Sequence, residues 1–303
     1  MPNNCCTPGK TNNCTEKGTC GSQASSIEVE EEKWDLPKDF DLFSKHELRK
    51  IYYPNVNDDD DNRHSFEIEC LEPSSPLDVI NKSESENQYD ATGHCVWTGA
   101  FLLIQCMDEL LSIVSTKNKR IIELGCGTGI GGLGIILASK ETKPDMVCFT
   151  DADPAVLEVC RRNCDLNELA EDSSYSIRQL TWGEGDASSN MGTFDVALAT
   201  DVLYDIDLCS PIFTTVSQCI PVGAPFILSH VPRACYNEGN PPEAIENLEQ
   251  YIIDRAKEHG LHLEIVIRPP HQDELQEELL SWYSKDAFSG SGILIFRKTD
   301  NAL

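Results

Sequence analysis

The chain lacks any run of about 18 consecutive apolar residues, the length that a transmembrane helix needs, so we expect none. Its first residues, MPNNCCTPGKTNNC, have neither the basic start nor the apolar stretch of a secretory signal. We therefore expect a cytoplasmic location, with the nucleus as the alternative. Basic residues are scarce, with 24 Lys and Arg against 51 Asp and Glu and a net charge of −27. This charge repels nucleic acid and anionic membranes, and we expect neither as a partner.

Several common catalytic patterns are also missing. The seven histidines show no H-x-x-x-H spacing, and no G-x-S-x-G occurs. Ten of the 14 cysteines lie between Cys70 and Cys235, several in apolar stretches, as is typical of buried, reduced thiols. The other four stand in a polar segment with no standard zinc spacing, and there we favour a mobile tail over a metal site: Cys5, Cys6, Cys14 and Cys20. We predict no metal.

Composition divides the chain into three parts. Residues 1–33 are polar and contain a short acidic run, which predicts a disordered tail. Residues 34–92 form an N-terminal extension, in which we expect a short helix over about 43–52, an acidic loop at NVNDDDDNR and a half-buried strand over 64–72. From 93 to 303 the pattern changes to apolar strands alternating with helices, which predicts the main domain.

That alternation predicts an α/β fold with a doubly wound, seven-stranded, mostly parallel sheet covered on both faces. The last two strands have no clean helix of usual length between them, so we expect a terminal antiparallel strand. The expected strands span 119–125, 145–153, 176–184, 193–201, 224–231, 261–269 and 292–298. The expected helices span 97–114, 129–140, 154–169, 208–220 and 242–260.

A glycine-rich turn, ELGCGTGIGG, follows the first of these strands and precedes a helix. Such a loop can bind either of two ligands, and the alternative is a glycine-rich turn that binds nothing. A dinucleotide needs G-x-G-x-x-G, which Gly127, Gly129 and Gly132 supply, but that register begins two residues late after the strand. The other register, acidic-x-Gly-x-Gly-x-Gly, begins at Glu123 and is found in S-adenosylmethionine enzymes. We favour S-adenosylmethionine, because Glu123 can answer the cationic amino-acid end of that cofactor and would repel a pyrophosphate.

Carboxylates follow two neighbouring strands. Asp151 closes the second strand and is positioned to accept hydrogen bonds from ribose hydroxyls. Asp153 lies past the strand end beside Pro154, which indicates a helix N-cap instead. Asp201 and Tyr204 follow the fourth strand in DVLY, where Thr200 and Asp201 would face the reactive end of the cofactor. In the alternative reading, Asp201 caps the helix that begins near residue 208 and Tyr204 only packs.

These motifs together resemble a known family. ELGCGTG, TD at 150–151, LTWG at 180–183 and DVLY at 201–204 are similar in order and spacing to the seven-β-strand protein lysine methyltransferases, as is GHCVWTGAFLL at 93–103. The likeness covers about 93–235 and implies a Rossmann-like S-adenosylmethionine-dependent methyltransferase domain over 93–303. It implies cofactor contacts at Trp97, Glu123, Gly125, Cys126, Gly127, Asp151, Trp182 and Thr200. Core packing is the alternative for both tryptophans, and Thr200 departs from the small apolar residue of many relatives.

The resemblance implies an S-adenosylmethionine-dependent protein-lysine N-methyltransferase that acts on a protein substrate. Tyr204 would orient the lysine amine, and Asp201 would help position it and bind the ammonium on arrival. The acidic charge favours a basic substrate protein, and we expect a monomer. The alternatives are a histidine, another protein nitrogen or a small amine as the acceptor, or a binding protein that keeps the fold without catalysis.

Overall fold

The computed structural model describes residues 46–53, 64–71, 92–138, 141–232, 241–269 and 291–300. The predicted tail over 1–33, the acidic loop and Cys235 lie outside these ranges. Within them, no helix combines the length and apolar character needed to cross a membrane.

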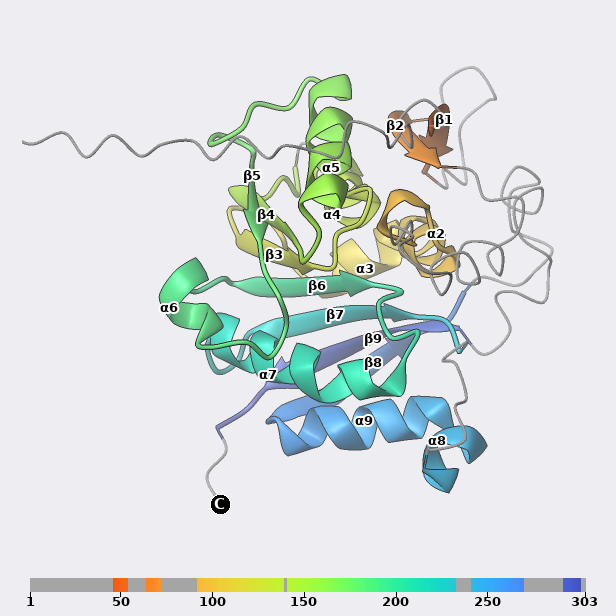
Figure 1. Cartoon of the computed structure of the whole chain (residues 1–303), viewed down its shortest axis with the longest axis vertical. Helices are drawn as coiled ribbons and strands as arrows, with labels where there is room; N and C mark the ends of the chain where they lie inside the picture. Colours follow the sequence, from red (N-terminus) through yellow and green to blue (C-terminus); the bar gives the residue numbers. More distant parts are fainter. Residues whose placement is uncertain are drawn as a thin grey trace, which may run out of the picture. The chain divides into compact units, whose positions relative to one another are not determined.

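A seven-stranded sheet forms the centre of the described fold (Figure 1). Its strands are β3 (Arg120–Leu124), β4 (Met146–Asp151), β5 (Tyr175–Gln179), β6 (Val196–Thr200), β7 (Pro225–His230), β8 (Leu261–Ile267) and β9 (Gly292–Lys298). They lie in the order β5-β4-β3-β6-β7-β9-β8, and β9 runs antiparallel to both its neighbours. The predicted fold class and the antiparallel terminal strand are confirmed. Strands such as β6, whose five residues are all buried, are apolar throughout because both faces are covered.

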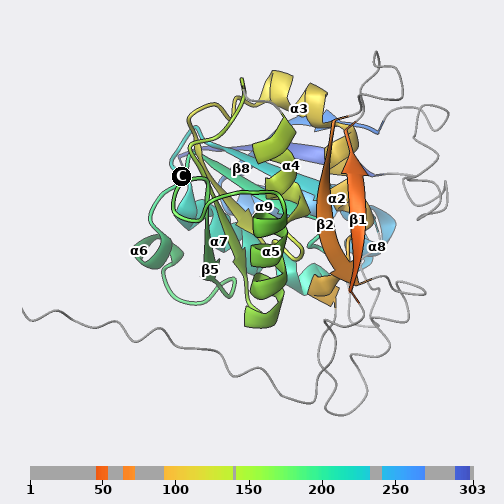
Figure 2. The ribbon, with the colours of Figure 1, turned by 90° about the horizontal axis from the view of Figure 1, so that it is seen from above.

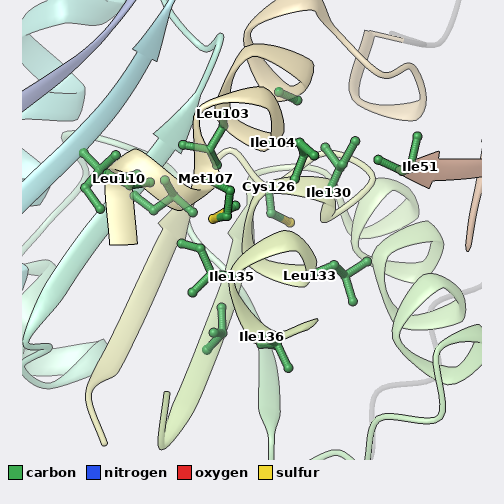
Figure 3. Packing of buried hydrophobic residues seen from close by; sticks show 14 of the residues in the cluster. Ile51, Leu103, Ile104, Met107, Leu110, Cys126, Ile130, Leu133, Ile135 and Ile136 are labelled. Carbon is green, nitrogen blue, oxygen red and sulfur yellow. The ribbon is translucent and has the colours of Figure 1, made fainter. Parts of the chain in front are cut away.

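Helices cover both faces of the sheet and bury two separate cores. On one face lie α2 (Thr98–Gln105), α3 (Met107–Ile113), α4 (Ile130–Ala138) and α5 (Pro154–Leu166), and on the other α6 (Ala187–Met191), α7 (Cys209–Cys219), α8 (Pro242–Glu246) and α9 (Leu248–Glu258). Figure 3 shows the first core, in which side chains of α2 and α3 meet those of α4. Burying each large aliphatic side chain there contributes about 1.5–3 kcal/mol.

A hairpin of β1 (His46–Tyr52) and β2 (Ser65–Leu71) stands beside α5, outside the main sheet (Figure 2). β2 confirms the strand predicted over 64–72. The helix predicted over about 43–52 is wrong, because β1 pairs with β2 residue by residue from His46↔Leu71 to Tyr52↔Ser65. Aromatic and β-branched residues at the end of β1 favour a strand once a partner is present, and Ile51 is buried in the first core.

Other predictions need smaller corrections. The third strand ends at Gln179 instead of 184, so Trp182 lies in the loop that follows. The helix predicted over 97–114 is divided at Cys106, and the one over 242–260 at Asn247, whose side chain accepts from Gln250 N–H to begin α9. Short 3-10 turns, η3 (Thr92–His94) and η4 (Ile206–Leu208), precede α2 and α7.

The cysteines behave as predicted wherever the structure describes them. Nine are buried thiols outside any disulfide: Cys70, Cys95, Cys106, Cys126, Cys148, Cys160, Cys164, Cys209 and Cys219. In this part of the chain they act as small apolar side chains and form no cross-links.

Candidate functional site

The glycine loop joins β3 to α4 at the carboxyl edge of the sheet. Gly125, Gly127 and Gly129 have φ values of +64°, +53° and +81°, in the left-handed region that favours glycine. A Cβ on Gly125 would lie 2.7 Å from Cζ2 of Trp182, and one on Gly127 would lie 3.2 Å from the carbonyl oxygen of Gly93. The loop backbone is therefore tightly enclosed, and side chains are excluded from it at these positions.

Cys126 anchors the middle of this loop. Its N–H donates to the Thr150 carbonyl at 2.9 Å, and its own carbonyl accepts from Gly129 N–H at 2.8 Å. Burial raises the pKa of the Cys126 thiol to about 12. The side chain is thus a buried, protonated thiol and not a nucleophile.

Glu123 lies beneath the first turn of α4 and is completely buried. Its Oε2 accepts from Gly132 N–H at 2.9 Å, whereas Oε1 has no hydrogen-bond partner among the described residues. Burial chiefly raises the pKa of this carboxyl to about 8, and the nearby charge of Asp151 adds to the rise. The carboxyl therefore adjoins the predicted cofactor loop from below, and its direct contact with a cofactor stays a prediction.

Asp151 ends β4 next to the glycine loop. Its Oδ2 accepts from Gly127 N–H and its Oδ1 from Asp153 N–H, each at 3.2 Å. Burial raises the pKa of this carboxyl, although the residue stays partly exposed. Asp153 caps α5 by accepting from Ala155 N–H at 2.8 Å, with Pro154 in the first turn, which confirms its predicted role.

Asp201 follows β6 in a left-handed conformation, with φ of +59°. Its N–H donates to the Ser229 carbonyl, and its Oδ2 accepts from Gly99 N–H at 2.8 Å in the first turn of α2. Helix N-termini offer such unpaired N–H groups, which a carboxylate satisfies well. The alternative in which Asp201 caps the helix near residue 208 is wrong, because α7 begins after Leu208 with no side-chain cap, and Asp205 caps the short turn η4 before it. Asp201 instead ties the end of β6 to the start of α2.

Tyr204 lies three residues further on, and 45% of it is exposed, whereas the intervening Val202 and Leu203 are buried. More than half of the residue is thus covered by protein, and the remainder is open to solvent. Tyr204 is thus an exposed aromatic side chain, and its predicted role at the mouth of a site stays a prediction.

The two predicted tryptophans are both partly exposed. Trp97 precedes α2, and its Nε1 donates to the Thr92 carbonyl at 2.9 Å. Trp182 packs on the second core, as the alternative reading expected, and also lies against Gly125. Thr200 is nearly buried at the end of β6, beside Gly131 of α4. The predicted residues are thus gathered around the carboxyl ends of β3, β4 and β6.

Sequence reasoning missed Asn163 on α5. This fully buried side chain donates from Nδ2 to the carbonyl of Thr128, inside the glycine loop, at 2.9 Å. The signal available was the pair Asn163 and Asn167, two amides one helical turn apart in an otherwise apolar and charged helix.

A hollow of about 530 Å³ lies away from the glycine loop, on the outer side of the hairpin and α5. It is lined by His46, Leu48, Glu69, Arg162, Asp165 and Leu166. Its walls mix apolar side chains with both signs of charge, and none of the predicted cofactor residues takes part.

Comparison with known proteins gives a consistent set of likenesses. A family model described as lysine methyltransferase matches residues 78–239, just over half of the chain. The calmodulin-lysine N-methyltransferase of Arabidopsis thaliana is 31% identical over 130 residues, which are 41% of this chain and 41% of that protein. The protein N-lysine methyltransferase METTL21A of Danio rerio is 34% identical over 110 residues (36% of this chain and 47% of that protein). The human protein-lysine N-methyltransferase EEF2KMT is 30% identical over 145 residues (44% and 42%). The matched regions span less than half the length of these relatives.

Proposed function

Because this chain belongs to the lysine methyltransferase family, we propose that it transfers a methyl group from S-adenosylmethionine to a lysine side-chain nitrogen of a protein. One structural observation carries the proposal. The DVLY segment follows β6 directly, and β6 pairs in parallel with β3, the strand that leads into the glycine loop. This strand pairing supports the proposal that Asp201 and Tyr204 serve the site at the edge where ligands bind in such sheets.

The residues of the site fit S-adenosylmethionine. The enclosed glycine loop lets backbone approach a ligand closely, and Asp151 is a partly exposed carboxylate beside it. Glu123 lies beneath the first turn of α4, and its pKa of about 8 leaves it protonated near neutral pH, so the fit to the cofactor rests on the glycine loop and Asp151. We propose that Asp151 would accept from the ribose, Trp182 would line the adenine side, and Trp97 would close the opposite side.

When bound, this cofactor supplies an electrophilic methyl group. The task of the chain is then to hold a neutral amine in line with it, and alignment alone can lower a barrier by about 7–11 kcal/mol. A free lysine has a pKa of about 10.4 and must lose its proton first, which partial burial near a cation favours. We assign the orientation of the amine to Tyr204. Asp201 acts as a positioning residue, because its bond to Gly99 N–H fixes the start of α2 behind Trp97.

The substrate we propose is a basic protein, because the chain carries a net charge of −27 and attracts positive surfaces. The relatives named as calmodulin-lysine and protein-lysine N-methyltransferases support a protein substrate. We further propose that the chain acts as a monomer in the cytoplasm or the nucleus.

The test is transfer of a labelled methyl group from S-adenosylmethionine to proteins of a cell lysate, with the Tyr204→Phe variant as control. We expect a labelled band whose modified residue is lysine by mass spectrometry, and loss of the label when that lysine is replaced by arginine. Label on histidine or on a small amine would overturn the choice of acceptor. Binding of the cofactor without any transfer would favour an inactive binding protein.

A further inference from the structure

The β1–β2 hairpin precedes the region matched by the family model, yet two amides fasten it to the main domain, one on α5 (Asn163) and one at the C-cap of that helix (Asn167). Asn163 Oδ1 accepts from Glu69 N–H at 2.6 Å, and its Nδ2 donates to the Glu69 carbonyl at 3.0 Å. Asn167 repeats the arrangement at Glu67, with distances of 3.1 and 2.6 Å. The two side chains thus pair with an edge of β2 as a neighbouring strand would. Figure 2 shows β2 running beside α5.

The spacing of the two elements explains this fit. Four residues along a helix advance about 6 Å, and two residues along a strand advance about 6.6–6.8 Å. Side-chain amides four residues apart, at Asn163 and Asn167, therefore reach backbone groups two residues apart on β2, at Glu69 and Glu67. The backbone N–H can only donate and its carbonyl only accept, so the orientation of each amide is fixed by its strand residue.

Asn163 differs from Asn167 in the use of its second amide hydrogen. Asn163 Nδ2 also donates to the Thr128 carbonyl at 2.9 Å, within the glycine loop. Asn167 Nδ2 donates to the Asn163 carbonyl at 2.8 Å, within α5 itself. One side chain therefore joins the hairpin to the cofactor loop, and its neighbour joins the hairpin to the helix alone.

A second connection runs from the hairpin toward the same loop. His46 Nε2 of β1 lies 3.2 Å from Nδ1 of His94, and both residues are buried or nearly so. His46 Nδ1 lies 3.2 Å from Arg162 Nη2 and 3.3 Å from Glu69 Oε1, so the ring is held between α5 and β2. The adjacent carbonyl of Gly93 packs against Gly127.

We propose that Asn163 is a positioning residue for the cofactor loop, and that Glu69 of the hairpin holds its amide in the orientation that supports Thr128. The hairpin is then part of the cofactor-binding unit and not a separate appendage. This inference rests on the proposed function, since it takes the glycine loop as the binding site for S-adenosylmethionine.

The experiment compares Asn163→Ala with Asn167→Ala in the full chain. Each variant removes the two hydrogen bonds of one asparagine to the β2 backbone. Both should therefore lower the urea concentration at the midpoint of unfolding by similar amounts. Titration calorimetry with S-adenosylmethionine should give a dissociation constant raised about fivefold by Asn163→Ala, the factor that one neutral hydrogen bond carries. Asn167→Ala should leave it unchanged within about twofold. Should an alanine variant not fold, the small polar replacements Asn163→Ser and Asn167→Ser carry the same expectation.

Hydrogen exchange of the ligand-free proteins gives a readout that needs no cofactor. Amides of residues 126–129 should exchange faster in the Asn163 variant than in the parent or the Asn167 variant. Equal affinity and equal loop exchange in the two variants would overturn the inference and make Asn163 a structural residue only. A parent protein that does not bind S-adenosylmethionine would refute the proposed function instead, and the exchange result would still decide the role of Asn163.

Discussion

Glu123 offers the sharpest test of the site, because its carboxyl is sealed beneath α4 and carries a strongly shifted pKa. Its ordinary pKa of 4.5 is raised to about 8 in the folded chain, chiefly by burial. Between these two values the folded state keeps a proton that the unfolded state releases, so this group stabilises the fold at low pH. That contribution is lost as the pH rises toward 8. A shift of this size corresponds to about 5 kcal/mol of folding free energy across the window.

The matched variant is Glu123→Gln, which has the same shape, still accepts from Gly132 N–H and cannot ionise. Urea unfolding of parent and variant at pH 5, 6, 7 and 8 gives the free energy of unfolding at each pH. We expect similar stability at pH 5 and a variant that is progressively more stable than the parent as the pH rises. The difference between the two curves isolates Glu123 from other titrating groups such as Asp151. Parallel curves would refute the reasoning, since they would mean that Glu123 ionises in the folded chain as it does in the unfolded one.

Three further predictions concern the loop and the DVLY segment. Tyr204→Phe should lower turnover on the order of a hundredfold with little change in cofactor affinity, because the residue lies at the surface outside the glycine loop; steady-state kinetics and calorimetry separate the two effects, and wild-type turnover would rule out the role. Gly127→Ala and the control Gly185→Ala each place alanine in a left-handed conformation, at about 1–2 kcal/mol. Nothing surrounds a Cβ at Gly185, so only Gly127→Ala should abolish cofactor binding in calorimetry, and equal binding by both would contradict the loop assignment. Asp201→Ala removes the bond to the Gly99 N–H and should destabilise the fold by about 1–3 kcal/mol in urea unfolding; unchanged stability would show that this bond is dispensable.

The sequence was most informative where a single local pattern determines the structure. Strands such as β6 are buried at every position and read as apolar runs, and glycines directly after β3 indicate a tight turn. The cap at Asp153 was predictable for the same reason, since an acid before Pro154 begins a helix with few alternatives. These local patterns were enough to predict the fold class and to select most residues of the candidate site.

Features that depend on a partner distant in the sequence could not be read in this way. The segment 46–52 becomes a strand only because β2 is available to pair with it, and its own residues gave a helical prediction. Asn163 bonds to Glu69, which is 94 positions away in the sequence, so no local pattern predicts their hydrogen bonds. The direction of the Glu123 carboxyl, toward Gly132 under α4, likewise depends on how the helix packs over the strand.

The order of strands in the main sheet has a consequence for how the chain is made. β9, formed by residues 292–298, lies between β7 and β8, both of which are synthesised before it. When β8 has left the ribosome, β9 is still missing, so β7 and β8 have no strand between them. Each then has an unpaired edge that can form wrong strand pairings. This half of the sheet must therefore finish folding after residue 298 has been synthesised. A stop codon before residue 292 would remove β9, the strand with which both β7 and β8 pair.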